Sequence, residues 1–328
     1  MNALASNCKV VCQVVSGYDL AFDIGQSGLR GIITSTRHEP AIFRIDTYRP
    51  SGSLADIVQG AVRALAQASG ISSFDAVTSG LTSVYGSVGP IDNVFGLLND
   101  EFGVNRLILS DDAFTSFLGA RGLTSGVVAA VGTGLVVLGI DATGTARRVD
   151  GMGPMAGDDG SGWWIGRRGF IAAVSAADGR ECGSAALLRS VISDYGSIDG
   201  ILEHIHSSES AIASVAEFAM NVVNAARSGD DVSISIMRRA AQYIGSAIIA
   251  GAGTEPPGKR IQFSIVGGVS AGADLLVPDI VEFACRRGLL AVHEKPLGSA
   301  LDGARLLGSV VGLERFEPLV RQASSRVG

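Results

Sequence analysis

Two apolar runs flank a glycine-rich turn in residues 18–35, YDLAFDIGQSGLRGIITS. Short apolar runs joined by glycines are typical of a strand–turn–strand hairpin. Residues 126–140, GVVAAVGTGLVVLGI, repeat this arrangement around Gly132-Thr133-Gly134. Because mixed helix and strand patterns follow each hairpin, we predict an α/β protein with a duplicated fold and two domains around a central cleft.

Length and composition also support two domains. The chain has 328 residues, more than a single hydrophobic core usually serves. Apolar residues make up 47% and charged residues 18%, and the formal net charge is −6. A mildly acidic chain lacks the basic footprint that nucleic acid requires, so we expect no nucleic-acid partner.

The uncharged residues 122–140 raise the question of a membrane span. The central Gly-Thr-Gly and its β-branched flanks favour two buried strands instead, and no signal-peptide layout is present. The four cysteines, Cys8, Cys12, Cys182 and Cys285, lack the paired spacing of a structural zinc site. We therefore expect a cytoplasmic protein with free thiols and no membrane partner.

Hydrophobic periodicity predicts the other elements. Residues 53–69 place apolar side chains at helical spacing, and short apolar runs bounded by turns are typical of buried strands. Further helices are expected over residues 91–102, 112–120, 162–177, 185–195, 211–228 and 231–253, and further strands over 41–47, 77–81, 106–109 and 260–266.

Three glycine-rich turns are candidates for nucleotide binding. In Asp23–Gly28, backbone N–H groups can approach a phosphate, and Asp23 can hold Mg²⁺, usually through water. The simpler reading is a hairpin with a solvated aspartate, and Gly132-Thr133-Gly134 is equally ambiguous alone. Gly267-Gly268 can admit adenine or ribose, or can be a plain strand-to-helix turn. Neither a P-loop nor a GxGxxG motif opening a helix occurs in the sequence.

Two aspartates are candidates for contact with a substrate. Asp112 follows a predicted strand and fits either a helix N-cap or a general base, with Asp111 as its competitor for both roles. Asp158 lies in residues 151–166, GMGPMAGDDGSGWWIG. There it can bind sugar hydroxyls, or it can take part in capping the helix that follows.

Six motifs follow one another along the chain: DIGQSGLR, SDDAFTSFLGA, VVAAVGTG, GPMAGDDGSGWWIGRRGF, ADGRE and FSIVGGVSAG. Together they resemble the BadF/BadG/BcrA/BcrD ATPase family, and within it the branch of N-acetylglucosamine and glucosamine kinases. The resemblance spans about residues 18–310, and GDDGSGWWIGR is its specific part. It implies a duplicated ribonuclease-H-like (actin-like ATPase) fold, with two domains closing over ATP and a sugar.

The resemblance also implies an activity and a set of site residues. The implied enzyme uses ATP and Mg²⁺ to phosphorylate a hexose or amino sugar, of the glucosamine or N-acetylglucosamine class, at the primary hydroxyl. Asp112 is then the catalytic base, Asp23 is the Mg²⁺ ligand, and Asp158 and Gly151 bind the sugar. The first phosphate loop contains Asp23, Gly25, Gln26 and Ser27, the second contains Gly132, Thr133 and Gly134, and the adenosine site contains Gly267 and Gly268.

The same resemblance suggests where the domains begin and end. Residues 1–120 form the N-terminal domain, with the first phosphate loop and the catalytic aspartate, and a C-terminal helix over residues 298–328 packs back on it. Residues 121–297 form the C-terminal domain, with the second phosphate loop and the adenosine site. Relatives of this kind are commonly homodimers.

Departures from the family pattern fall near the sugar. Leu135-Val136 stand where animal N-acetylglucosamine kinases carry Ser-Asn, and Met152 replaces a frequent Trp. We therefore expect an unacylated hexosamine or a plain hexose to be preferred. Two alternatives on the same fold stay open: a BadF-type ATPase activator, which needs cysteines near the second phosphate loop where Val131-Gly132 stand, and a non-catalytic sugar-sensing regulator.

Overall fold

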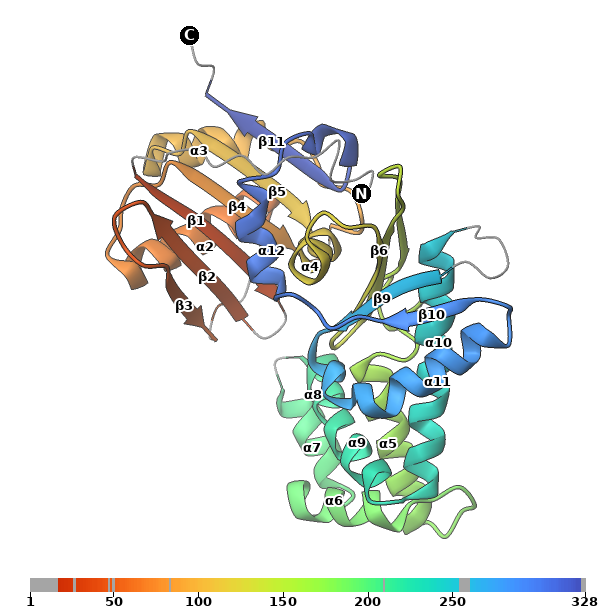
Figure 1. The fold of residues 1–328 in the computed structure, drawn as a ribbon. Helices are drawn as coiled ribbons and strands as arrows, with labels where there is room; N and C mark the ends of the chain where they lie inside the picture. Colours follow the sequence, from red (N-terminus) through yellow and green to blue (C-terminus); the bar gives the residue numbers. More distant parts are fainter. Residues whose placement is uncertain are drawn as a thin grey trace. The chain divides into compact units, whose positions relative to one another are not determined.

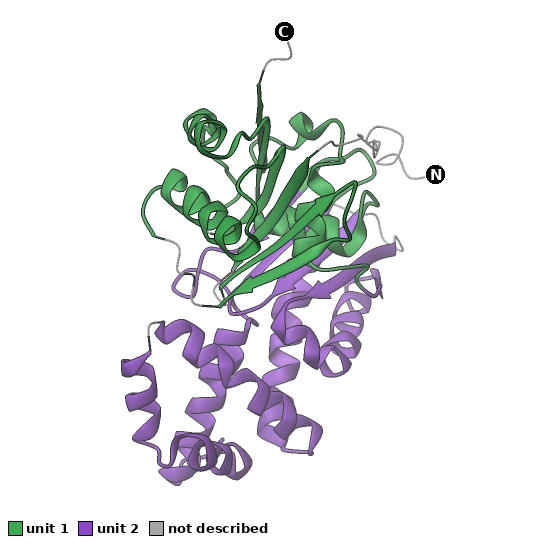
Figure 2. Ribbon diagram, turned by 90° about the vertical axis from the view of Figure 1, so that its left-hand side faces the viewer, with its two compact units in different colours: residues 1–125, 140–146, 296–328 green, residues 126–139, 147–295 purple. Residues whose placement is uncertain are grey.

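The chain folds into two units, each built on one mixed β-sheet with helices packed on it (Figures 1 and 2). Residues 1–125, 140–146 and 296–328 form the first unit, and residues 126–139 and 147–295 form the second. The computed structural model describes residues 17–25, 28–46, 48, 51–82, 84–208, 210–253 and 260–325.

The first unit has six strands in the spatial order β11-β5-β4-β1-β2-β3. The hairpin strands β1 and β2 and the next strand β3 are antiparallel, whereas β4 and β5 continue the sheet parallel to β1. The strands are β1 (Tyr18–Gly25), β2 (Gly28–Ser35), β3 (Ala41–Ile45), β4 (Ala76–Leu81), β5 (Arg106–Asp111) and β11 (Val320–Ser324); the helices are α2 (Leu54–Ser69), α3 (Asp92–Phe102), α4 (Asp112–Arg121), α12 (Ala300–Leu307) and the 3₁₀ helix η2 (Leu313–Phe316).

The second unit has five strands in the order β10-β9-β6-β7-β8. The strands are β6 (Gly126–Val131), β7 (Leu135–Ile140), β8 (Ala146–Asp150), β9 (Arg260–Val266) and β10 (Leu290–His293). The helices are α5 (Gly162–Ala177), α6 (Ala185–Tyr195), α7 (Gly200–Ser207), α8 (Ala211–Glu217), α9 (Ala219–Arg227), α10 (Asp231–Ala252), the 3₁₀ helix η1 (Gly268–Gly272) and α11 (Ala273–Cys285).

Apart from β11, which has no counterpart among the described residues of the second unit, the two sheets share one topology. In each, a strand pair joined by a glycine turn is followed by a third strand on one side, and two later strands in parallel orientation extend the other side. The predicted duplicated α/β fold is confirmed. Each sheet has its own hydrophobic core, and the core of the second unit includes the buried Trp164.

Close helix packing fixes the position of α4 against α12 in the first unit. A β-carbon on Gly119 of α4 would collide with the carbonyl oxygen of Ser299, and one on Gly303 of α12 would collide with that of Thr115. The two helices therefore touch through their backbones, which only glycine allows. Because α4 begins at Asp112, this contact also fixes where that residue lies.

The prediction of a helix over residues 298–328 is confirmed only for α12 (Ala300–Leu307) and is wrong for the rest of the described residues there. The helix ends at Leu307, and the segment that follows contains three residues that interrupt helices, Gly308, Gly312 and Pro318. The chain then forms β11, which pairs antiparallel with β5 and forms the edge of the sheet. The helix expected over 211–228 is divided into α8 and α9 at Phe218, and β8, α7 and β10 were not expected.

The apolar segment 122–140, for which a membrane span was considered, contains strands β6 and β7, as predicted. Within the described part of the chain, each helix is too short or too polar to cross a membrane. Cys182 and Cys285 are exposed free thiols, whereas Cys8 and Cys12 lie outside the described residues.

Candidate functional site

In the first unit, the two aspartates singled out from the sequence lie at the same edge of the sheet. Asp23 of β1 is level with Gly80 of β4, and Gly80 is level with Ser110 of β5. Neighbouring strands are about 4.8 Å apart, so Asp23 and Ser110 are separated by roughly 10 Å. Asp112 follows Ser110 by two residues, at the carboxyl ends of the parallel strands, where ligands of open α/β sheets bind.

Asp23 is buried and ion-paired. Its side chain meets the guanidinium of Arg30, which lies directly opposite on β2 and is 43% exposed. This pairing holds the Asp23 carboxylate in place and leaves part of the Arg30 fork open to solvent. Gln26 and Ser27 of the predicted phosphate loop lie outside the described residues, and only the flanking Gly25 and Gly28 are described.

A bound Mg²⁺ is compatible with this edge. Among the described residues, no group of three or more His, Cys, Asp or Glu side chains could form a metal cage. Mg²⁺ in phosphoryl-transfer enzymes usually needs less: one or two carboxylates, waters and the substrate phosphates. Asp23 supplies one such carboxylate, and Arg30 beside it can share the charge of a phosphate.

Asp111, and not Asp112, is the N-cap of α4. The Asp111 side chain is 1% exposed; Oδ1 accepts a hydrogen bond from the Ala113 N–H at 2.9 Å, and Oδ2 accepts one from the Gly86 N–H at 2.8 Å. Asp112 occupies the first helical position and is half-buried. The capping explanation for Asp112 is therefore wrong.

In the second unit, the turn Gly132-Thr133-Gly134 is bonded to the start of α5. The Gly162 N–H donates to the Gly132 carbonyl at 2.8 Å, and the Trp163 N–H donates to the Thr133 carbonyl at 3.0 Å. Ser161 caps α5 by accepting from a later backbone N–H. The turn between β6 and β7 is thus held in place by the helix that follows the Asp158 loop.

Gly267 packs against the same turn. Its φ is 91°, and a β-carbon there would lie 2.5 Å from the Val131 carbonyl oxygen, so only glycine fits. By contrast, a β-carbon on Gly132 or on Gly268 would meet no atom within 4 Å. The two glycine turns therefore adjoin each other and both border open space, which a nucleotide needs for close backbone contact.

Asp158 also contacts this turn. Its Oδ1 accepts a hydrogen bond from the Leu135 N–H at 3.0 Å, and its Oδ2 lies where a β-carbon on Gly134 would be 2.8 Å away. Burial raises the pKa of Asp158, while the Leu135 N–H acts against that increase. A carboxylate held against this turn is suited to accept hydrogen bonds from hydroxyl groups.

The structure therefore brings together most of the predicted residues, in two sets. Asp23, Gly25 and Asp112 belong to the first unit, and Gly132–Gly134, Asp158 and Gly267-Gly268 belong to the second. Gly151 begins the loop that leads to Asp158, with a φ of 75°.

Two neighbours of these residues were missed from the sequence. Arg30 had a usable signal, since any hairpin closed at Gly25 and Gly28 places residue 30 opposite Asp23. Asp150 holds the loop before Asp158, and its only signal was an aspartate followed by glycine, a common turn pair.

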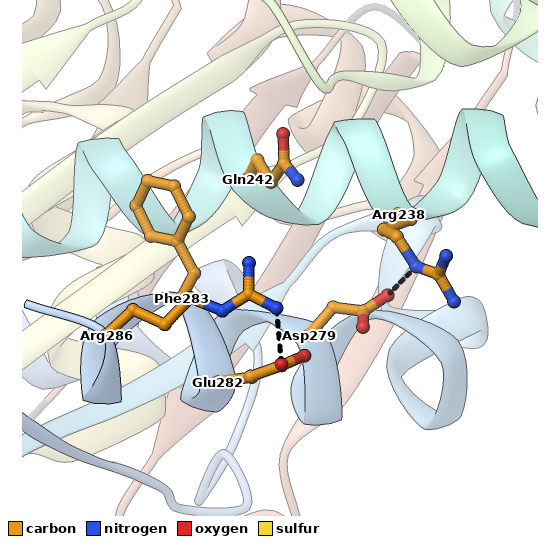
Figure 3. Close-up of a pocket in the computed structure, with 6 residues that line it drawn as sticks. All are labelled: Arg238, Gln242, Asp279, Glu282, Phe283 and Arg286. Carbon is orange, nitrogen blue, oxygen red and sulfur yellow. Dashed lines mark hydrogen bonds and ion pairs between the residues drawn. The ribbon is translucent and has the colours of Figure 1, made fainter.

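A hollow of about 280 Å³ between α10 and α11 has a different character (Figure 3). Its charges are arranged in pairs: Arg238 lies 3.8 Å from Asp279, and Arg286 lies 2.5 Å from Glu282. Exposed ion pairs of this kind contribute little to stability. Because each positive charge is balanced by a negative one, the hollow offers no net attraction for a phosphate. We assign it no role in nucleotide binding.

Comparison with known families matches most of the chain to a family model. The model of the BadF/BadG/BcrA/BcrD ATPase family matches residues 41–308. A curated relative, the N-acetylmuramic acid/N-acetylglucosamine kinase of Clostridium acetobutylicum, is 26% identical over 184 residues. That alignment covers 55% of this chain and 60% of the relative, so the match spans less than two thirds of the relative's length.

Solved structures extend the similarity to nearly the full chain. The candidate N-acetylglucosamine kinase of Chromobacterium violaceum is 25% identical with a TM-score of 0.64, covering 89% of this chain and 98% of that one. A ROK family glucokinase of Streptomyces griseus, in complex with glucose and AMPPNP, is 18% identical with a TM-score of 0.55, covering 88% and 99%. At this lower identity the likeness concerns the fold alone, which is of the actin/hexokinase type.

Proposed function

We propose that this chain, which belongs to the BadF/BadG/BcrA/BcrD ATPase family, is a sugar kinase that transfers the γ-phosphoryl group of ATP to the primary hydroxyl of a hexose or amino sugar. Membership of an ATPase family implies ATP binding. The observation that carries the proposal is the contact of Gly132–Gly134 with both Gly267 and Asp158, because phosphate, adenosine and sugar residues would adjoin in that arrangement.

Phosphoryl transfer depends on alignment and charge neutralisation. In our proposal, the backbone N–H groups of the glycine turns and the Arg30 guanidinium hold phosphate oxygens. Mg²⁺, held through Asp23, would neutralise charge on the phosphates. Asp112 accepts the proton of the attacking hydroxyl, and Asp158 orients the sugar by accepting hydrogen bonds from its other hydroxyls.

The sugar site supports our preference for an unacylated substrate. An acetamido group brings one donor and one acceptor, and leaving either desolvated and unpaired costs about 1–3 kcal/mol. Leu135 and Val136 have apolar side chains, and the Leu135 N–H already donates to Asp158. We therefore propose that glucosamine or a plain hexose is used better than N-acetylglucosamine, although the names of the Clostridium and Chromobacterium relatives point to N-acetylated sugars.

A coupled assay of ADP release tests the proposal. Purified protein with Mg·ATP is offered glucosamine, glucose, N-acetylglucosamine and N-acetylmuramic acid, and kcat/KM is measured for each. We expect strong stimulation, greatest with glucosamine or glucose. A clear preference for an acetylated sugar would refute the substrate assignment alone, whereas absence of stimulation by any sugar, with folded protein, would refute the kinase.

The same assay identifies one alternative, because a BadF-type ATPase activator would release ADP without any sugar. A sugar-sensing regulator would release no ADP, and isothermal titration calorimetry would show that it still binds sugar. We also propose a cytoplasmic homodimer, and light scattering during size-exclusion chromatography measures the oligomeric state.

A further inference from the structure

Asp150 closes the loop that carries Asp158. Its Oδ1 accepts two backbone hydrogen bonds, from the Gly151 N–H at 2.8 Å and from the Asp158 N–H at 3.0 Å. Asp150 and Asp158 are eight residues apart, so one carboxylate oxygen joins the two ends of the loop. A β-carbon on Gly157 would collide with the same oxygen, so the carboxylate also fills the inside of the loop base.

The backbone at both ends of this loop adopts a conformation that most residues avoid. Asp150 has a φ of 62° and Asp158 has a φ of 63°, both in the left-handed region. Such conformations in residues other than glycine persist only where the surroundings enforce them, and they cluster at functional sites. The two hydrogen bonds to Asp150 supply that constraint.

The two hydrogen bonds to Asp150 also affect where the Asp158 side chain lies. With its backbone N–H held by Asp150, Asp158 directs Oδ1 to the Leu135 N–H and places Oδ2 against Gly134. We propose that Asp150 is a positioning residue for the sugar: it holds the loop so that the Asp158 carboxylate faces the glycine turn. This inference rests on the proposed sugar kinase function.

Asp150 also acts on Asp158 through its charge. Burial is the main cause of the raised pKa of Asp158. The negative charges of Asp150 and Asp159 add to the increase, whereas the Leu135 N–H and Arg148 oppose it. Arg148 is itself tied to the same place, because its Nη1 donates to the Asp150 carbonyl at 2.7 Å. Removing only the charge of Asp150 should therefore lower the pKa of Asp158 without opening the loop.

Two substitutions of Asp150 distinguish the loss of its hydrogen bonds from a general effect on folding. Asp150→Gly and Asp150→Asn both suit a positive φ. Asparagine keeps an oxygen that can accept both N–H groups, whereas glycine removes it.

We expect Asp150→Gly to raise the sugar KM about tenfold or more, since displacing a substrate-positioning group by 1 Å can cost 10²-fold. The KM for ATP should hardly change, and the melting temperature should fall by on the order of 5 °C because the N–H groups of Gly151 and Asp158 lose their acceptor. Asp150→Asn should keep the sugar KM near that of the wild type. Because the ionised Asp158 binds the hydroxyls, activity is lost as pH falls through its pKa, and Asp150→Asn should move this acid limb of kcat/KM to lower pH.

Amide hydrogen exchange of the ligand-free protein gives a readout that does not depend on activity. Asp150→Gly should speed exchange at the amides of Gly151 and Asp158, and Asp150→Asn should retain their protection. Asp141→Gly is the matched control, because Asp141 Oδ1 likewise accepts from the N–H groups of Thr143 and Thr145 in another loop. That control should alter only its own loop and leave the sugar KM unchanged.

The outcomes are distinct for the two proposals. Equal increases of the sugar and ATP KM values in Asp150→Gly, or the same exchange in the glycine and asparagine variants, would overturn the positioning role. If the wild-type protein phosphorylates no sugar, the sugar kinase function fails and the role in sugar binding fails with it. The exchange measurement would then still decide whether Asp150 holds the Asp158 backbone.

Discussion

Asp111 and Asp112 are neighbours for which the structure predicts opposite consequences of the same substitution. Asp111 accepts hydrogen bonds with both carboxylate oxygens, from Ala113 and from Gly86, and is 1% exposed. Asp112 begins α4 at the carboxyl edge of the sheet. Changing each aspartate to asparagine replaces one oxygen by an NH₂ group with almost the same shape.

The expected magnitudes follow from these contacts. In Asp111→Asn, the remaining oxygen can still cap Ala113, but the Gly86 N–H then faces an amide NH₂. An unsatisfied donor of this kind costs about 1–3 kcal/mol, which lowers the melting temperature by on the order of 5 °C. In Asp112→Asn, the side chain keeps almost the same shape, and the loss of a negative charge from the first helical turn contributes less than about 1 kcal/mol. If Asp112 is the general base, however, kcat falls by roughly 10²–10⁴.

Thermal melts and steady-state kinetics on the two variants test this pair of expectations. Asp111→Asn should lose stability and keep kcat within about tenfold of the wild type, whereas Asp112→Asn should keep stability and lose kcat. The reasoning is refuted if Asp111→Asn loses more kcat than Asp112→Asn while both proteins are folded at the assay temperature.

Three other predictions concern both units. Asp23→Ala should weaken Mg·ATP use and leave sugar affinity nearly unchanged, and titration calorimetry showing equal loss of both would indicate a collapsed hairpin instead. Burial, together with the nearby Asp75, raises the pKa of Asp19 to about 6, so the stability contributed by its protonated form is lost as pH rises from 4 to 6. Asp19→Asn should raise the free energy of unfolding by roughly 1 kcal/mol at pH 7.5, after allowance for partial exposure, and by almost nothing at pH 4; urea melts giving an equal gain at both pH values would contradict this. Gly267→Ala should destabilise the protein by about 2 kcal/mol or more, because its φ of 91° and its contact with a carbonyl exclude a β-carbon, whereas Gly268→Ala meets no atom and should be nearly neutral in a melt.

Elements with strong local signals could be predicted from the sequence. Apolar periodicity, together with glycine and serine at the ends of the apolar runs, predicts the hairpins β1–β2 and β6–β7 and the helices α5 and α6. The boundaries of these elements differ from expectation by at most one residue. The edge strands β8 and β11 carry arginine and polar residues and lack a clear alternating pattern. Pairing with a neighbouring strand, a long-range interaction, determines their structure.

The candidate site shows the same division. The glycine turns and Asp158 stand out because their chemistry is local and unusual in composition. Asp150 acts on a backbone group eight residues away. That contact depends on the path of the intervening loop, which the amino-acid sequence does not reveal. The choice between Asp111 and Asp112 also needed the structure, because Gly86 comes from a distant segment of the chain.

The most direct test of sugar kinase activity is the ratio of phosphorylated sugar to ADP. Phosphorus NMR of a reaction with Mg·ATP and the best sugar of the panel follows ADP, sugar phosphate and inorganic phosphate together. A kinase should form one sugar phosphate, on the primary hydroxyl, for each ADP, and Asp112→Asn should reduce both products equally. Release of ADP with inorganic phosphate and no sugar phosphate would contradict the kinase and indicate an ATPase.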